Sequence, residues 1–294
     1  MLFRSYPARY GDRMSGVMNM SLREPQKPVE TELSLSFFNA SALSLGTFGG
    51  QDQGDWLLAA RRGNLDLIAE VVDPEVGSPE YQDYLMHVAW EFGPRTQLSA
   101  NFLASIDKLI LNDPDRGEQA IANYDNRVLW LKWGADWNER WRSETIISVS
   151  HISNRRTGSL TLPDIVSGSL DEYREFDALG IKQDWTYIPS KNWMLSFGVN
   201  GELQEATYRF DSTKTVSAPF DVILDNVPFQ VRSINAEPEG AQYSAYLEAR
   251  WQLRPNLIVD AGLRWDRQNY TTADDDNQTK IGRASCRERV SSPV

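Results

Sequence analysis

The sequence predicts an all-β protein, an antiparallel up-and-down transmembrane β-barrel that is incomplete in this chain. Between about residues 80 and 270, runs of alternating apolar and polar residues recur in pairs, and a period of two residues is that of a β-strand. The runs cover about 9 to 13 residues, the length that a tilted strand needs to cross a bilayer. Lys, Arg, Asp and Glu avoid their apolar positions, where Gln183 and His151 are the exceptions, as a lipid-facing surface requires.

Four hairpins carry this alternation, each with two strands joined by a short turn. The last hairpin is the clearest, because apolar residues at odd positions from Tyr243 to Trp265 alternate with Gln, Ser, Glu, Arg and Asp. The predicted strand pairs and their turns are 84–92 and 98–106 around 93–95, 129–137 and 141–152 around 138–140, 179–187 and 193–199 around 189–191, and 243–251 and 257–265 around 254–255.

The stretch from residue 31 to residue 63 is predicted to hold three further strands. If the short turns are periplasmic, the strand that ends at Phe92 runs inward, and an odd number of crossings must precede it. We place these strands near 31–38, 40–48 and 55–63, with turns at Asn39-Ala40 and at Gly49 to Gly54, so that about eleven strands form an open curved sheet. The polar segments 64–82, 107–123, 154–173 and 211–240, and the chain from 271 onward, are predicted to be extracellular loops.

Tryptophan is concentrated near the short turns. Indole rings prefer the headgroup level of a membrane, so this placement predicts an interfacial girdle at the periplasmic rim. The alternative, an aromatic core of a soluble β-sandwich, explains the alternation but not the confinement to one end. The residues assigned to the girdle are Trp90, Trp133, Trp137, Trp141, Trp185, Trp193 and Trp251.

Composition excludes several functional classes. The net charge of −11 and the pI near 4.8 argue against a nucleic-acid partner, since phosphate binding needs clustered Lys and Arg. One cysteine, Cys286, and two histidines, His87 and His151, predict neither a disulfide framework nor a metal centre. Acidic runs at 112–115 and 274–277 lack the spacing of a calcium loop, so solvated loops are favoured. No metal and no cofactor are therefore expected.

A family resemblance begins at the N-terminus. The run from Tyr6 to Met20, YPARYGDRMSGVMNM, resembles the end of the plug domain of TonB-dependent outer-membrane receptors. The hairpin from Tyr246 to Asp266 and the run from Trp56 to Arg62 are similar to barrel strands of the same family. The resemblance implies that the plug motif comprises Tyr10, Gly11, Arg13, Ser15, Gly16 and Val17, with Gly11 and Gly16 supplying backbone freedom for tight turns.

The resemblance also implies a domain organisation. Residues 1–28 are expected to be the remnant of a plug domain, and residues 29–280 the N-terminal half of a receptor barrel. The run from Ile281 to Val290 is similar to one reading frame of a sequencing-library adapter, so residues 281–294 are expected to be a non-native tail. A natural basic tail is the alternative. Signal peptide, TonB box, plug apex and later strands are absent from this sequence and are expected in a full-length parent.

The function implied by the resemblance is active uptake of a scarce, unidentified small ligand across the outer membrane of a Gram-negative bacterium. The expected partners are outer-membrane lipid and, for the full-length parent, the TonB complex, and the fragment alone is not expected to transport. The alternatives are a passive porin or another non-TonB barrel, and a barrel hydrolase, which would need a Gly-x-Ser-x-Gly elbow that the sequence lacks. No enzyme activity or catalytic residue is expected. The predicted lumen-facing residues are Gln97, Asn101, Lys132, Asp136, Lys182, Asp184, Glu202, Glu248, Arg250 and Arg264.

Overall fold

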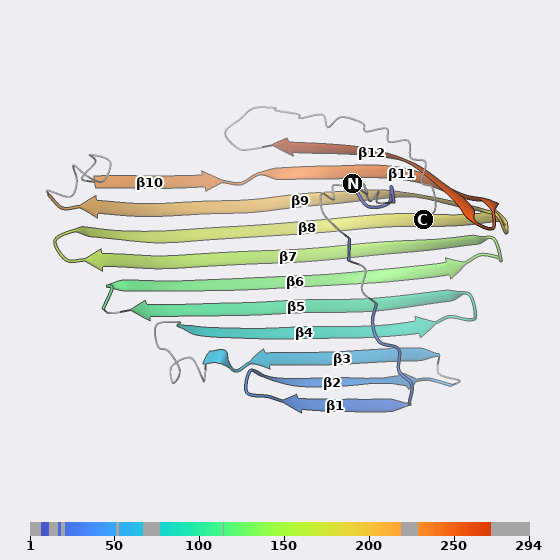
Figure 1. Cartoon of the computed structure of the whole chain (residues 1–294), viewed down its shortest axis with the longest axis horizontal. Helices are drawn as coiled ribbons and strands as arrows, with labels where there is room; N and C mark the ends of the chain where they lie inside the picture. The colour runs from blue at the N-terminus through green and yellow to red at the C-terminus, as the bar shows by residue number, and fades with distance from the viewer. Residues whose placement is uncertain are drawn as a thin grey trace.

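The computed structural model describes residues 7–11, 17–18, 21–50, 53–66, 77–113, 115–218 and 229–271. These residues form one twelve-stranded antiparallel sheet (Figure 1). Its strands are β1 (Val29–Leu35), β2 (Asn39–Phe48), β3 (Gly54–Gly63), β4 (Ser78–Glu91), β5 (Thr96–Asp113), β6 (Glu118–Asp136), β7 (Trp141–Leu162), β8 (Val166–Ser190), β9 (Trp193–Val216), β10 (Phe229–Ala236), β11 (Glu239–Arg254) and β12 (Leu257–Thr271).

The predicted up-and-down topology is confirmed. Each strand pairs with its neighbour in sequence from β1 to β9, and β11 and β12 follow. Within the described residues the sheet is open, because β1 and β12 each pair with a single strand. Short turns join β4 to β5, β6 to β7, β8 to β9 and β11 to β12 at one end, which we call the periplasmic end as predicted. The opposite end is called extracellular.

The three strands predicted before residue 64 are confirmed as β1, β2 and β3. The first turn was placed wrongly at Asn39-Ala40, because Asn39 already begins β2. The amide of Ser36 instead donates to the carbonyl of Asn39 over 2.8 Å. Phe37 and Phe38 therefore form the turn.

The loops predicted at 107–123 and 154–173 are wrong for most of their length. β5 continues to Asp113 and β6 begins at Glu118, while only residues 163–165 separate β7 from β8. Asp164, with φ of 62°, closes that second connection. The ladder needs only backbone groups and continues where both faces are polar, so the hydrophobic alternation ends before the strands do.

The segment 211–240, predicted as a loop, is also partly wrong, and the expected count of eleven strands is one short. β9 runs to Val216, and β10 pairs with its outer part from Tyr208 to Thr215. β11 then pairs with β9 from Glu205 inward. β10 and β11 therefore occupy successive stretches of the same edge, separated at Glu237-Pro238. Proline has no N–H to donate to a ladder, which accounts for the break.

The two faces of the sheet differ in chemistry. We call the face that residues 7–11 contact the inner face and the opposite one the outer face. On the outer face of β6 to β9, two successive rows are apolar, namely Leu131, Ile147, Ile181 and Gly201, then Leu129, Val149, Leu179 and Leu203. The next row is Arg127, His151, Asp177 and Glu205. One pleat therefore separates an apolar band from a charged surface.

The predicted tryptophan girdle has a structural counterpart. Near the periplasmic end, Trp193 and Trp251 stack with ring centroids 4.9 Å apart, and Trp137 stacks on Trp185 at 6.3 Å. Trp141 packs against Trp185, and Trp90 against Phe48. All seven predicted residues lie on the outer face by strand register and ring contact. Their place at a membrane interface remains a prediction.

The facing of the strands can be tested in a full-length receptor that contains this segment. Nitroxide labels on cysteines introduced at Leu247 and Leu263 should collide mainly with dissolved oxygen, because both residues face outward. Labels at Arg250 and Asp260, on the inner face, should collide mainly with a water-soluble nickel chelate. Equal access of the chelate to both pairs, measured by spin-label power saturation, would contradict a lipid-facing outer surface.

Candidate functional site on the inner face

The N-terminal segment docks on the inner face over β11 and β12. A turn closes it, since the amide of Tyr10 donates to the carbonyl of Pro7 over 3.0 Å. Nη1 of Arg264 donates to the carbonyls of Ala8 and Arg9 at 3.2 and 3.3 Å. The amide of Arg9 donates to Glu248 Oε1 over 3.1 Å. Two predicted lumen-facing residues, Glu248 and Arg264, therefore hold this segment.

Two glycines permit this close approach. A Cβ atom on Gly11 would lie 2.2 Å from Nε of Arg264, so the guanidinium occupies the space that a side chain would need. A Cβ on Gly262 would lie 2.9 Å from Cβ of Ala8. Larger residues at either position would push the segment away from the sheet.

Beside this contact, a tyrosine reaches across a strand. Asp184 on β8, Gly198 on β9 and Tyr246 on β11 are direct cross-strand neighbours. The hydroxyl of Tyr246 donates to Asp184 Oδ1 over 2.7 Å. A Cβ on Gly198 would lie 2.4 Å from Asp184 Oδ1 and 2.7 Å from the Tyr246 ring. The missing side chain is therefore what lets β8 and β11 interact directly.

Strand register places all ten predicted lumen-facing residues on the inner face. It brings only Asp184, Glu248 and Arg264 together, around Tyr246 and the N-terminal segment. Most of the others pair locally: Lys132 with Glu144, Asp136 with Arg142, Lys182 with Asp184, Arg250 with Asp260, Glu202 with Gln204, and Asn101 with His87. Gln97 lies near the periplasmic start of β5. That this face lines a lumen remains a prediction.

A second constellation lies toward the extracellular end of the same face. Glu172 is only 2% exposed and lies between two arginines. Nε of Arg156 donates to Oε2 over 2.7 Å, and Nε of Arg174 donates to Oε1 over 2.6 Å. Burial raises the pKa of the Glu172 carboxyl, but the hydrogen bonds and charges of the two arginines outweigh burial and hold it below its ordinary value.

Aromatic rings extend this constellation across β9 and β10. The guanidinium of Arg174 lies 5.4 Å from the ring centroid of Tyr208, and that of Arg232 lies 5.7 Å from the ring of Phe210. Both arrangements are cation–π contacts. We call Arg156, Glu172, Arg174, Tyr208, Phe210 and Arg232 the basic aromatic cluster. Its three arginines and one carboxylate leave an excess of positive charge, which can attract an anionic ligand.

Both histidines are hydrogen-bonded to carboxylate or amide side chains. His87 bonds through Nε2 to Asp55 at 3.0 Å and through Nδ1 to Asn101 at 2.6 Å. His151 lies on the outer face and bonds to Asp177 at 2.8 Å. Neither imidazole contacts a hydroxyl or thiol nucleophile in the described part of the chain. No group of three or more His, Cys, Asp or Glu that could hold a metal ion occurs among the described residues.

The predicted plug motif is only partly within the described residues. Tyr10 and Gly11 belong to the docked segment, and Val17 lies within the described residues. Arg13, Ser15 and Gly16 lie outside the described residues, as does the predicted tail at 281–294. The assignment of these residues to a plug and to a foreign tail therefore stays a prediction.

The basic aromatic cluster and the role of Tyr246 were not predicted from the sequence. Arg156, Glu172 and Arg232 lie in segments that were interpreted as loops. Arg174, Tyr208 and Phe210 lie between those loops and the predicted strands, where facing was not considered either. Their even numbers in β7, β8 and β9 continue the parity of Lys182 and Asp184, which is the signal that would have placed them together. No sequence pattern indicated that Gly198 would open a path between Asp184 and Tyr246.

With this geometry in place, comparisons with known proteins decide the family. The family described as TonB dependent receptor-like, beta-barrel, matches residues 78–291, more than half of the chain. The chain belongs to this family. The matched range includes most of the tail that was predicted to be foreign. No curated protein sequence matches the chain.

Solved structures with the same fold are receptors of this family. The FpvAI receptor in complex with pyocin S2 has a TM-score of 0.59 at 12% identity, covering 89% of this chain and 40% of its own. BauA, the ferric preacinetobactin receptor from Acinetobacter baumannii, has a TM-score of 0.58 at 12% identity, and the match covers 86% of this chain and 42% of BauA. The ferripyoverdine receptor of the Pseudomonas aeruginosa outer membrane has a TM-score of 0.56 at 12% identity, and the match covers 90% of this chain and 40% of that receptor.

The chain therefore spans about two-fifths of the length of these receptors. The predicted all-β class and the TonB-dependent receptor family are confirmed. The family consists of outer-membrane receptors rather than enzymes. Among the described residues, no helix has the length and apolar character to cross a bilayer.

Docking of the N-terminal segment can be tested by a disulfide in the full-length receptor. The variant Ala8→Cys/Gly262→Cys should crosslink on mild oxidation, because the two Cβ positions lie 2.9 Å apart and a displacement of the segment by about 1 Å gives the roughly 3.8 Å of a disulfide. A gel shift that a reductant reverses reports the bond. The control pair Ala8→Cys/Gly201→Cys should stay reduced, since Gly201 lies on the outer face. Equal crosslinking of both pairs would contradict the docked arrangement.

Glu172 should stabilise the extracellular part of the sheet in a pH-dependent way. Because its pKa is lowered on folding, the contribution is present above pH 4.5, the ordinary value, and is lost as the pH falls through the lowered pKa. Glu172→Gln should therefore speed proteolytic cleavage of this region at pH 7 and have a smaller effect at pH 3. The matched control, Glu175→Gln on the outer face, should change the cleavage rate much less at pH 7, because Glu175 lacks the two arginine partners. An equal effect of Glu172→Gln at both pH values would contradict this role.

Proposed function

We propose that this chain forms part of the barrel wall of a receptor that imports a ferric siderophore by TonB-dependent transport. The observation that carries this proposal is the basic aromatic cluster on the inner face. Iron(III) is a hard cation that is chelated by anionic oxygen donors, and its complexes with catecholate or additional carboxylate donors carry net negative charge. Arginines and aromatic rings at the extracellular end can bind such a complex through ion pairing, hydrogen bonds and ring contacts.

The ligands of two structural relatives support the same class of ligand, a ferric siderophore. BauA is named as a receptor for ferric preacinetobactin, and the Pseudomonas receptor was solved with ferripyoverdine. At 12% identity these names define a class and not a particular molecule. Cobalamin, oligosaccharide and peptide carry less negative charge or none, and so would interact more weakly with the three arginines of the basic aromatic cluster.

The domain assignment and the role of the TonB complex as the energy source belong to this proposal. Residues 1–28 would be the end of a plug, residues 29–280 barrel wall, and residues 281–294 a tail foreign to the receptor. The docked segment at residues 7–11 supports the first assignment, because a plug must contact the inner wall. In the full-length receptor, the TonB complex would act on plug residues that precede this chain. A passive porin, the alternative, has no comparable use for such a segment.

Uptake by the full-length receptor provides the test. Expressed in cells that lack their own siderophore receptors, it should support growth on at least one ferric siderophore and lose this ability when tonB is deleted. Arg174→Ala/Arg232→Ala should weaken binding of that siderophore by about tenfold or more, because two charge-assisted contacts are removed. Radioactive iron uptake and equilibrium binding measure the two effects.

Two controls make the result specific. Lys191→Ala removes an exposed charge from the periplasmic turn between β8 and β9 and should leave binding unchanged. Heat-modifiable migration on a gel should show that each variant forms a folded barrel. Uptake that persists without TonB would favour a passive porin, and full binding by the double arginine variant would remove the basic aromatic cluster from the ligand site.

A further inference from the structure

The four short turns at the periplasmic end each carry one basic residue. These turns lie together at the right-hand end of the sheet in Figure 1. Three of the basic residues directly precede or follow a strand, and the fourth is the last residue of β11. All four side chains are exposed. We call these residues, Arg95, Arg140, Lys191 and Arg254, the basic rim.

Backbone hydrogen bonds hold the basic rim in a line along the end of the sheet. The carbonyls of Arg95, Arg140 and Asn192 each accept a hydrogen bond from an amide of the next hairpin, over 2.7, 2.9 and 2.9 Å. Asn192 is the neighbour of Lys191 in the same turn. Each turn is therefore tied to the following hairpin, and successive basic residues are about two interstrand spacings, or roughly 10 Å, apart.

The protein does not neutralise the basic rim. In the described part of the chain, no carboxylate oxygen lies within 4 Å of a side-chain nitrogen of any of its four residues. Glu139 is the one acidic residue within the four turns. Glu91 and Asp136, at the adjacent strand ends, lie on the inner face, and Asp136 is paired with Arg142. The turns therefore carry an excess of positive charge.

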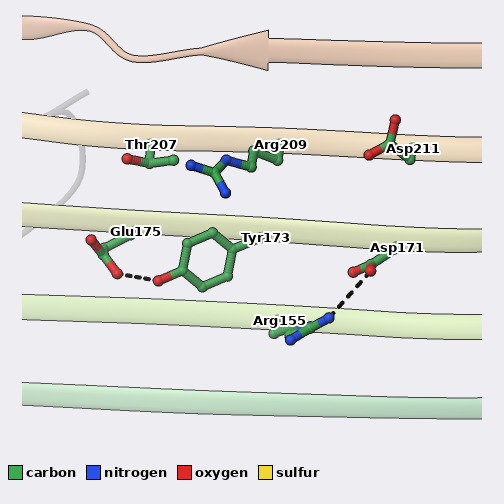
Figure 2. A pocket seen from close by; sticks show the side chains of 7 residues that line it. All are labelled: Arg155, Asp171, Tyr173, Glu175, Thr207, Arg209 and Asp211. Atoms are coloured by element: carbon green, nitrogen blue, oxygen red, sulfur yellow. Dashed lines mark hydrogen bonds and ion pairs between the residues drawn. The ribbon is translucent and has the colours of Figure 1, made fainter.

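Two arginines at the extracellular end of the outer face are paired instead. Figure 2 shows an open depression across β7, β8 and β9, with a volume of about 560 Å³, in which Arg155 donates to Asp171 over 3.2 Å. Arg209 lines the same depression and pairs with Glu237 at 3.7 Å. Three carboxylates and two arginines line this depression, so it does not attract an anion. The two ends of the sheet therefore differ, and the anion-attracting one is the basic rim.

Girdle tryptophans adjoin the basic rim. Trp193 lies two residues after Lys191, and Trp251 lies three residues before Arg254. The two rings stack with centroids 4.9 Å apart, so both basic residues are close in sequence to one aromatic pair. Indole rings prefer the headgroup level of a membrane, and Lys and Arg can extend their charged ends further toward water. With the girdle at the membrane interface, as predicted, the basic rim is at the depth of the lipid phosphates.

We propose that the basic rim binds anionic phospholipids of the periplasmic leaflet. Guanidinium and ammonium groups donate charge-assisted hydrogen bonds to the phosphodiester, and the girdle rings contact the acyl chains. One Lys or Arg near an anionic membrane surface strengthens the attraction about fivefold. A phospholipid whose headgroup also carries a cation is neutral overall and is attracted less. This binding rests on the predicted place of the girdle and is separate from ligand uptake, which the inner face serves.

The test uses a full-length receptor whose only cysteine is Leu253→Cys, labelled with bimane and reconstituted in phosphatidylcholine vesicles. Leu253 lies between Trp251 and Arg254 and is 42% exposed. Lipids brominated near the top of their acyl chains quench the label on contact. Half-maximal quenching should need about tenfold less brominated phosphatidylglycerol than brominated phosphatidylcholine, because Lys191 and Arg254 lie near the label. High salt should reduce this preference.

Two double variants make the result specific. Lys191→Gln/Arg254→Gln should abolish the preference, so that both brominated lipids quench alike. The matched control, Arg155→Gln/Arg209→Gln, removes two exposed arginines from the opposite end and should keep the preference. Heat-modifiable migration shows that each variant is folded before it is compared. The proposal is overturned if the two lipids quench the unchanged receptor equally, if the rim variant keeps the preference, if both variants lose it, or if soluble polyglutamate displaces phosphatidylglycerol.

Discussion

The unbroken hydrogen-bond ladder through β6, β7, β8 and β9 is the constraint on which the rest of the structure depends. In hydrocarbon, every backbone N–H and C=O must find a partner within the protein, and a closed sheet is one of two ways to achieve this. The register from β6 to β8 has no shift, and that between β8 and β9 shifts only near Ser190. A slip of one residue would exchange the faces of a whole strand. The docked N-terminal segment and the basic aromatic cluster share one face only because no such slip occurs.

The sequence contained enough information to predict the membrane-crossing part of the fold. The alternation of Leu129, Leu131 and Trp133 arises because lipid contacts only every second residue, so this pattern is visible without a structure. The strand extensions leave no such trace, since both faces of Tyr173, Arg174 and their neighbours meet polar surroundings. β10 was missed for the same reason, and its separation from β11 depends on a single proline.

The candidate site likewise has a part that was predictable from the sequence and a part that was not. Parity assigned residues such as Glu248 and Arg264 to the inner face, because facing is a local property of a strand. It could not show that Asp184 and Tyr246 touch, since they are 62 positions apart and meet only because Gly198 lacks a side chain. Likewise, Glu172 gains its two arginine partners from β7 and from its own strand, and only the fold brings Arg156 beside it. Contacts between distant segments require the register, which the sequence alone does not fix.

The outer face changes sharply from an apolar row to a polar one, and this boundary would determine the depth of the barrel in a bilayer. The apolar row is Leu129, Val149, Leu179 and Leu203, and the polar row is Arg127, His151, Asp177 and Glu205. If the barrel sank by one pleat, four polar or charged groups would enter hydrocarbon together. Each costs little near the interface, but the cost rises to about 2 to 4 kcal/mol for Arg at the midplane. If the barrel rose by one pleat, a row of leucines and valine would meet water. In a bilayer both displacements would be unfavourable, so this boundary would fix the depth of the barrel to within about one pleat.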